Sequence, residues 1–218
     1  EGLISDCQVT GTIEVIDQES CGGIAGINNT GGTIQNCSTQ MEFVGKAYRV
    51  ILSSIGGIAG WNGNYDDYSG EISDYESCTI RNCCVKNTYV NSDGSVIVGG
   101  ITGHNFLNSV ITDSYSLAEL EGVLVGGIAA YVWDNSSIIN CYAAGPMSGE
   151  QVGGIVGYLA LGEGTEPIVA NSFWDIQTTG QADSMGGKGL TTEQMKTVWI
   201  FQNAGWADHG WVMEDGVD

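Results

Sequence analysis

Basic residues are scarce in this sequence. Of the 218 residues only 6 are Lys or Arg, whereas 26 are Asp or Glu, which gives a formal net charge of -20 at pH 7. A surface of this charge repels phosphate groups, so we exclude nucleic acids and anionic membrane surfaces as partners. We interpret the acidity as a source of solubility, with attraction of Ca²⁺ or of a basic partner as the alternative.

Long apolar runs and catalytic motifs are also missing. No stretch of about 18 apolar residues occurs, and no signal peptide is recognisable, so we expect no membrane insertion. His-Glu-x-x-His, Gly-x-Ser-x-Gly and a phosphate-binding glycine loop are absent. Neither a Cys-x-x-Cys pair nor a cluster of cysteine and histidine is present, which argues against zinc. We therefore expect no cofactor and no enzymatic activity.

Glycine, in contrast, is abundant, and a Gly-Gly-Ile phrase recurs five times. The copies lie at Gly22-Gly23-Ile24, Gly56-Gly57-Ile58, Gly99-Gly100-Ile101, Gly126-Gly127-Ile128 and Gly153-Gly154-Ile155. A second phrase, Ile-x-Asn/Asp-Cys/Ser, follows at 34–37, 80–83, 111–114 and 138–141, with a looser copy at 169–172 and an orphan copy at 4–7. The orphan copy leads us to expect that the chain begins inside a repeat.

These repeats predict the fold. Each unit offers three short β-prone runs without a helical apolar period, and a short unit of this kind is typical of one coil of a solenoid. We expect an all-β, parallel β-helix of about five coils, right-handed, with strands about 4.8 Å apart. The Gly pairs would allow close backbone approach or supply dihedral angles closed to other residues. We assign 1–175 to the solenoid and 176–218 to a capping segment of the same domain.

Three columns of equivalent residues carry further expectations. Asn36, Asn82, Asp113, Asn140 and Asn171 should form a hydrogen-bonded ladder between coils. Cys7, Cys37, Cys83 and Cys141 exchange with Ser114 and Ser172 in one column, which indicates stacked buried thiols rather than bridges. Tyr115, Tyr142 and Phe173 should form an aromatic stack.

Two isolated features complete these local expectations. If any disulfide forms, Cys78 with Cys83 or Cys84 is the local pair best placed for it. His104, which has no neighbouring His or Cys, is interpreted as a turn residue.

The second coil carries a long insertion between Gly60 and Ile80, and insertions in repeat proteins often lie on the binding face. Aromatic rings beside carboxylates and amides suit a carbohydrate. The candidate ligand-binding residues are Trp61, Asn62, Asn64, Tyr65, Asp66, Asp67 and Tyr68. The alternative is an acidic, solvated loop whose rings pack on the solenoid. A Ca²⁺ loop lacks support, because Asp67 stands where the EF-hand turn needs Gly.

The last segment should close the array. Thr191 and Gln194 form a capping box, so we expect a short helix from about Thr192 to Phe201. The large side chains that we expect to form a lid over the last coil are those of Trp199, Phe201, Trp206 and Trp211.

The repeat Val-Gly-Gly-Ile-x-Gly, followed by Ile-x-Asn-Cys-Tyr, resembles the GLUG repeat of bacterial surface and secreted proteins. The stretch from Asn171 to Lys196 is similar to the segment that closes such arrays. The likeness extends from Ile4 to about Trp211, and its departures are the long insertion and Ala130 in place of the phrase's final Gly. It implies a β-helical module of larger envelope or exported proteins, including adhesin-like proteins and immunoglobulin-A-cleaving metallopeptidases, and implies no activity for the module.

We therefore expect a noncatalytic, secreted or cell-surface module, either a spacer or an adhesin-like region. Its partners would be a host glycan or extracellular protein and the neighbouring domains of the parent chain. The alternatives are the accessory region of such a metallopeptidase, or a β-helix carbohydrate-active enzyme. In the enzyme, Asp66 with Asp67, or Asp74 with Glu76, would serve as acid and base, although no Lys or Arg lies near them before Arg81.

Overall fold

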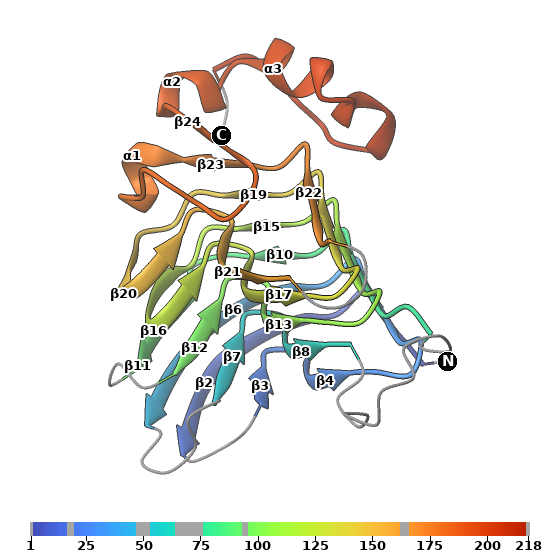
Figure 1. Ribbon diagram of the computed structural model, residues 1–218, viewed down its shortest axis with the longest axis vertical. Coiled ribbons are helices and arrows are strands. Elements are labelled where there is room, and N and C mark those ends of the chain that lie inside the picture. Colours follow the sequence, from blue (N-terminus) through green and yellow to red (C-terminus); the bar gives the residue numbers. More distant parts are fainter. Residues whose placement is uncertain are drawn as a thin grey trace.

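The computed structural model describes residues 2–16, 20–46, 53–63, 76–92, 96–161 and 166–216. The chain winds through about five stacked coils, with the first strands at one end and the helices at the other (Figure 1). Every strand pairing among these residues is parallel, and equivalent residues of successive coils lie opposite one another; Ile80, for example, pairs with Ile34 and Ile111. The predicted parallel β-solenoid is confirmed.

Three sheets form the faces of the solenoid. Sheet A consists of β1 (Leu3–Ser5), β5 (Thr33–Gln35), β9 (Thr79–Arg81), β14 (Val110–Thr112), β18 (Ser137–Ile139) and β22 (Ile168–Ala170). Sheet C consists of β4 (Ala25–Asn28), β8 (Ala59–Asn62), β13 (Thr102–Asn105), β17 (Ala129–Trp133) and β21 (Val156–Ala160).

Sheet B is the largest of the three. Its strands are β2 (Gln8–Ile16), β3 (Ser20–Gly22), β6 (Ser38–Lys46), β7 (Ser54–Gly56), β10 (Cys84–Val85), β11 (Tyr89–Ser92), β12 (Ile97–Gly99), β15 (Tyr115–Ser116), β16 (Glu119–Gly126), β19 (Tyr142–Ala143), β20 (Met147–Gly153), β23 (Phe173–Asp175) and β24 (Lys188–Leu190).

The Gly-Gly-Ile phrase is one of the three runs of each unit that we expected to form a strand, but it forms a corner between sheets B and C instead. In the third coil β12 ends at Gly99, and β13 begins at Thr102, just after Ile101. The Gly pairs serve close backbone approach: a Cβ on Gly57 would overlap the carbonyl oxygen of Gly100, and one on Gly100 would overlap that of Gly127. These glycines have ordinary, negative φ values, so special dihedral angles are not the reason for them.

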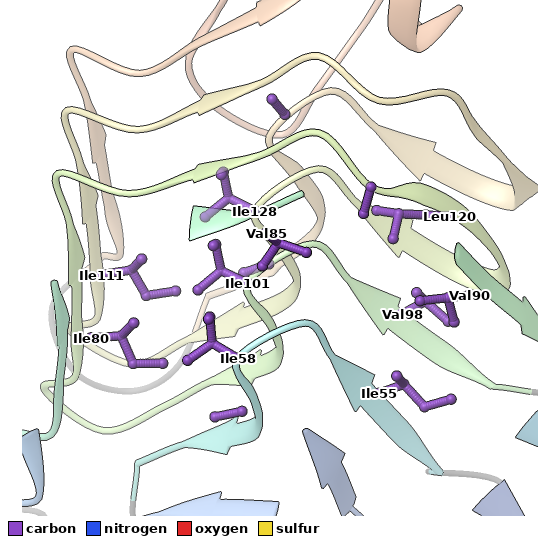
Figure 2. Packing of buried hydrophobic residues seen from close by; sticks show 14 of the residues in the cluster. Ile55, Ile58, Ile80, Val85, Val90, Val98, Ile101, Ile111, Leu120 and Ile128 are labelled. Carbon is purple, nitrogen blue, oxygen red and sulfur yellow. The ribbon is translucent and has the colours of Figure 1, made fainter. Parts of the chain in front are cut away.

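Isoleucine side chains from the corners fill the core. Ile58, Ile101 and Ile128 stack in a column with 0% exposure, beside a second column that contains Ile80 and Ile111 (Figure 2). Burying each of these side chains stabilises the fold by about 1.5 to 3 kcal/mol before the entropy of ordering is counted. The repeat of the sequence is thus a repeat of core contacts.

The outer Asn/Asp column forms the expected ladder only in part, because no side-chain hydrogen bond joins Asn82 to Asp113, and Asn140 Oδ1 has no partner among the described residues. Asn82 Nδ2 donates to Asn36 Oδ1 at 3.3 Å, and Asn140 Nδ2 donates to Asp113 Oδ1 at 3.1 Å. All five members of the column have left-handed φ values, between 49° and 55°. Asn and Asp tolerate this conformation better than other side chains with a Cβ, which is why the column accepts only these two residues.

All seven cysteines are free thiols, and those of the repeat column are stacked in the core. Cys37, Cys83 and Cys141 have at most 1% exposure. Burial raises the pKa of Cys83 and of Cys141 to about 12. The predicted burial is confirmed for Cys37, Cys83 and Cys141, whereas Cys7 is only partly buried. The local bridge from Cys78 to Cys83 or Cys84 is not formed.

This burial predicts selective alkylation. Iodoacetamide at pH 8 should modify the partly exposed Cys84 while the native protein leaves Cys83 and Cys141 unmodified, because only an accessible thiolate reacts. Peptide mass spectrometry after timed quenching measures the rates, and the same reaction in denaturant is the control, in which all thiols should react. Equal rates for these three thiols in the native protein would contradict the stacked core.

The C-terminal segment contains α1 (Ile176–Thr179), α2 (Thr192–Met195), α3 (Val198–Asn203) and the 3-10 helix η2 (Trp206–His209). The capping box of Thr191 and Gln194 is confirmed. The prediction of a single helix from about Thr192 to Phe201 is wrong, because α2 ends at Met195 and α3 begins at Val198. No helix of the residues described is long and apolar enough to cross a membrane.

The lid over the last coil differs from the expected one. The ring of Trp174 covers Gly154, and the backbone N–H of Gly154 donates to the carbonyl of Asp183 at 3.0 Å. Phe201 and Trp206 instead pack together with Phe173 beside the solenoid. Trp211 belongs to the same group, whereas Trp199 is 68% exposed. Trp174 and the loop after α1 therefore close the last coil.

Candidate binding surface on sheet C

The residues predicted to bind a ligand begin in β8 and continue into the insertion. Trp61 and Asn62 occupy the end of β8, and both are buried, with exposures of 5% and 0%. Asn64, Tyr65, Asp66, Asp67 and Tyr68 lie outside the described residues, so their role stays a prediction. The same is true of Asp74, a candidate acid or base.

Asn62 belongs to a ladder inside the solenoid. Its side chain accepts from Asn28 Nδ2 at 2.8 Å and donates to Asn105 Oδ1 at 2.8 Å. Such buried amides are satisfied by one another and need no ligand. Asn28, Asn62 and Asn105 each stand six residues after the first Gly of their phrase, a signal that could have revealed this second ladder. The structure therefore gives Asn62 a structural role and corrects its assignment to a ligand.

Aromatic rings form a row on the outer side of sheet C. The ring centroids of Trp61 and His104 are 5.1 Å apart, those of His104 and Tyr131 5.5 Å, and those of Tyr131 and Tyr158 5.4 Å. These separations follow from the parallel register, which places one residue of each coil opposite the next at about 4.8 Å. Coil stacking thus converts a repeated sequence position into a continuous row of rings.

Phe106 and Trp133 widen the row. The ring of Phe106 meets those of Tyr131 and Trp133 edge-on, at centroid distances of 5.8 and 6.1 Å. Edge-to-face pairs of this kind add about 0.5 to 1.5 kcal/mol beyond the burial of area, so they hold the rings in fixed orientations.

His104 is a strand residue inside this row, and its interpretation as a turn residue is wrong. Its side chain is 3% exposed, and its Nδ1 atom lies 3.0 Å from Ser54 Oγ in sheet B. Loss of hydration lowers the pKa of His104 to about 3. The ring is therefore neutral at physiological pH and acts as a packing element.

Exposure increases along the row. Trp61 and His104 are buried, Phe106, Tyr131 and Trp133 are partly exposed, and Tyr158 is 41% exposed. We call Phe106, Tyr131, Trp133 and Tyr158 the aromatic face. It lies where β13, β17 and β21 run side by side towards the C-terminal end of sheet C (Figure 1).

The chemistry of the aromatic face suits contact with an apolar surface. Its rings are rigid and amphipathic, and the two tyrosines and the tryptophan each bring a polar atom. None of the four side chains is a carboxylate or an imidazole, the usual groups for proton transfer near neutral pH. In the part of the chain that the structure describes, no group of three or more His, Cys, Asp or Glu side chains is arranged to hold a metal ion.

Comparisons with known proteins agree with the repeat and the fold. The model of the GLUG motif matches residues 121–145, which contain the fourth Gly-Gly-Ile phrase and the Ile-x-Asn-Cys phrase that follows it. A crystal structure from Bacteroides ovatus, provisionally described as an immunoglobulin A1 protease, is similar in fold, with a TM-score of 0.61 and 19% identity over 92% of this chain and 70% of the other. A comparison with curated proteins gives no match.

Proposed function

Since the chain carries a GLUG motif within a parallel β-solenoid, we propose that it is a noncatalytic, extracellular binding module whose aromatic face holds a neutral glycan chain. The observation that supports this proposal is the row of rings on sheet C. Tyr131 and Tyr158 are spaced at 5.4 Å, close to the length of one sugar unit, and both reach the surface. Pyranose rings present apolar C–H faces that stack on such rings, while the polar atoms of Tyr and Trp meet the hydroxyl groups.

The charge of the protein selects the kind of glycan. With a net charge of -20 the molecule repels sulfated or uronic-acid polymers, so a neutral chain is the favoured ligand. A protein surface with exposed apolar side chains is the second ligand class, because rigid aromatic side chains are also the commonest anchors of protein interfaces.

A second candidate function is that of an accessory region in a larger protease. The fold shared with the Bacteroides ovatus structure favours this second function. At 19% identity, however, the likeness is limited to the fold. A place outside the cell, on its surface or secreted, is part of the proposal in either case. The alternative of an enzyme with catalytic carboxylates on the insertion stays untested, because Asp66, Asp67 and Asp74 lie outside the described residues.

The proposal predicts binding that depends on Tyr158. In a screen of neutral glycans and host matrix proteins, the intact protein should bind, and Tyr158→Ala should weaken the strongest interaction by about tenfold, since stacking on one ring contributes about 1 to 1.5 kcal/mol. Trp133→Ala should weaken it further. Biolayer interferometry against the immobilised hit measures both effects.

The matched control is Trp199→Ala, which removes an aromatic side chain of even greater exposure, 68%, from α3 rather than from sheet C. This variant should bind as the intact protein does. An intact protein that binds nothing in the screen, or equal affinities for Tyr158→Ala and Trp199→Ala, would rule out the aromatic face as the site.

A further inference from the structure

Three thiols of the cysteine column lie in successive coils at the start of the solenoid. The register that joins β1 to β5 and β2 to β6 places Cys7 opposite Cys37, and the register of β5 with β9 places Cys37 opposite Cys83. Adjacent strands of a sheet are about 4.8 Å apart. The Cα atoms of a disulfide are about 4.4 to 6.8 Å apart. Cys7 and Cys37 therefore have the backbone separation that a disulfide requires.

The side chains of Cys7 and Cys37 point in the same direction. Cys7 Sγ donates to the carbonyl oxygen of Ser5 at 3.3 Å, and Cys37 Sγ donates to that of Gln35 at 3.1 Å, so the same contact is made in each coil. The carbonyl of Cys7 accepts from the backbone N–H of Ser38 at 2.8 Å, which holds the two backbones side by side. Since a thiol is a weak donor, little is lost when one side chain rotates towards the other sulfur.

Only one thiol of this pair can be reached from solvent. β1 is the outermost strand of sheet A, and among the described residues β2 pairs only with β6. Cys7 is accordingly partly exposed, whereas Cys37 has 1% exposure. Burial is the main cause that raises the pKa of Cys37. Because an accessible thiolate is the group that attacks a disulfide, Cys7 is the thiol that reacts first with an external reagent.

We propose that Cys7 and Cys37 are a redox-active pair, which a small-molecule disulfide, RSSR, converts to a disulfide between the first two coils. The Cys7 thiolate attacks one sulfur of RSSR, and a mixed disulfide forms as one RS⁻ leaves. The Cys37 thiolate then attacks Cys7 Sγ and displaces the second RS⁻. Two cysteines are thus oxidised and one RSSR is reduced to two RSH, because the protons lost by the cysteines pass through solvent to the leaving thiolates.

The bridge would fasten the first coil to the second and enclose about 30 residues of chain. It would oppose the separation of β2 from β6, where the solenoid is covered on one side only. The inference concerns these thiols alone and holds whether or not the aromatic face binds a glycan.

Two other partly exposed cysteines serve as internal controls, because the residues opposite them are not cysteines. Cys84 lies opposite Ser38 and Tyr115, and Cys21 lies opposite Ile55. The same reagent should leave Cys84 and Cys21 as mixed disulfides or unmodified, without a bridge between coils.

The test is incubation of the native protein with oxidised 2-mercaptoethanol at pH 8. Free thiols are then blocked with N-ethylmaleimide in mildly acidic denaturant, and peptides are mapped by mass spectrometry without reduction. The cross-linked peptide of Cys7 and Cys37 should exceed any other cross-link by about tenfold, since the second step is intramolecular. Hydrogen exchange of the β2 amides should slow by about tenfold after oxidation, because the bridge opposes local opening.

Two serine variants test the order of the steps, and serine fits the column because Ser114 occupies it in a later coil. Cys37→Ser should stop at a mixed disulfide on Cys7, and Cys7→Ser should leave Cys37 and Cys83 reduced. Cys84→Ser is the control and should still form the bridge. The proposal would be overturned by an unmodified Cys7 in the native protein, by a mixed disulfide there that does not resolve, or by a bridge from Cys37 to Cys83 in its place.

Discussion

Acidification from pH 7 to pH 4 should reduce the free energy of unfolding of the intact protein by about 3 kcal/mol more than that of the variant His104→Gln. The cause is the buried imidazole, whose pKa is lowered from 6.5 to about 3 by desolvation. The unfolded chain takes up a proton at His104 below pH 6.5, whereas the folded protein takes it up only near pH 3. Stability contributed by the neutral ring is therefore present above pH 6.5 and is lost as the pH falls towards 3.

Urea unfolding at pH 7, 6, 5 and 4, followed by circular dichroism, measures the difference. Comparison with His104→Gln is needed because the many carboxylates also titrate in this range, and their contribution is common to both proteins. His209→Gln, which replaces the other histidine, is the control and should keep the steep loss. Parallel profiles for the intact protein and His104→Gln would contradict the burial of His104 between sheets B and C.

Gly100→Val should unfold the protein or destabilise it by more than about 4 kcal/mol, the range of severe core overpacking. A Cβ at Gly100 would overlap the carbonyl oxygen of Gly127 and the side chain of Ser116, and neither backbone can retreat without separating two coils. Gly26→Ala is the matched control, because a Cβ there meets only the carbonyl of Ser20 at 3.4 Å. Thermal and urea unfolding measure both variants. A Gly100→Val protein as stable as Gly26→Ala would show that the corners are not closely packed.

The repeats predict most of the fold because a solenoid translates sequence period directly into contacts. Ile101 repeats Ile58 in the sequence and packs on it in the core, and Asn82 hydrogen-bonds to Asn36 for the same reason. The cysteine column was predictable on the same basis, since a position shared with Ser114 needs a small buried side chain.

The predictions that proved wrong concern residues whose side-chain direction is not determined by the period of the sequence repeat. The Gly-Gly corner sets the angle between sheets B and C, and this angle buries His104 against Ser54. The sequence around His104 contains no sign of that neighbour, which is 50 residues away. Asn62 looked like part of the insertion, but its place six residues after Gly56 puts it in the internal ladder.

The sequence predicted that the candidate binding surface is aromatic, but it predicted only part of the location of that surface. Aromatic side chains were expected to mark it, and the row does begin at Trp61. Its exposed part, however, is the aromatic face on later coils, which consists of Phe106, Tyr131, Trp133 and Tyr158. These residues are far apart in the sequence from the insertion, and only the register of the coils aligns them. The lid was similarly misplaced, because Trp174 and not the four later aromatic residues covers the last core layer.

The measurement that tests the central claim most directly is a crystal structure of the protein in complex with the strongest glycan from the screen. The account predicts a sugar ring stacked on Tyr131 or Tyr158, with the chain running across β17 and β21. A glycan bound at the insertion or on sheet A, with the aromatic face left open to solvent, would contradict it.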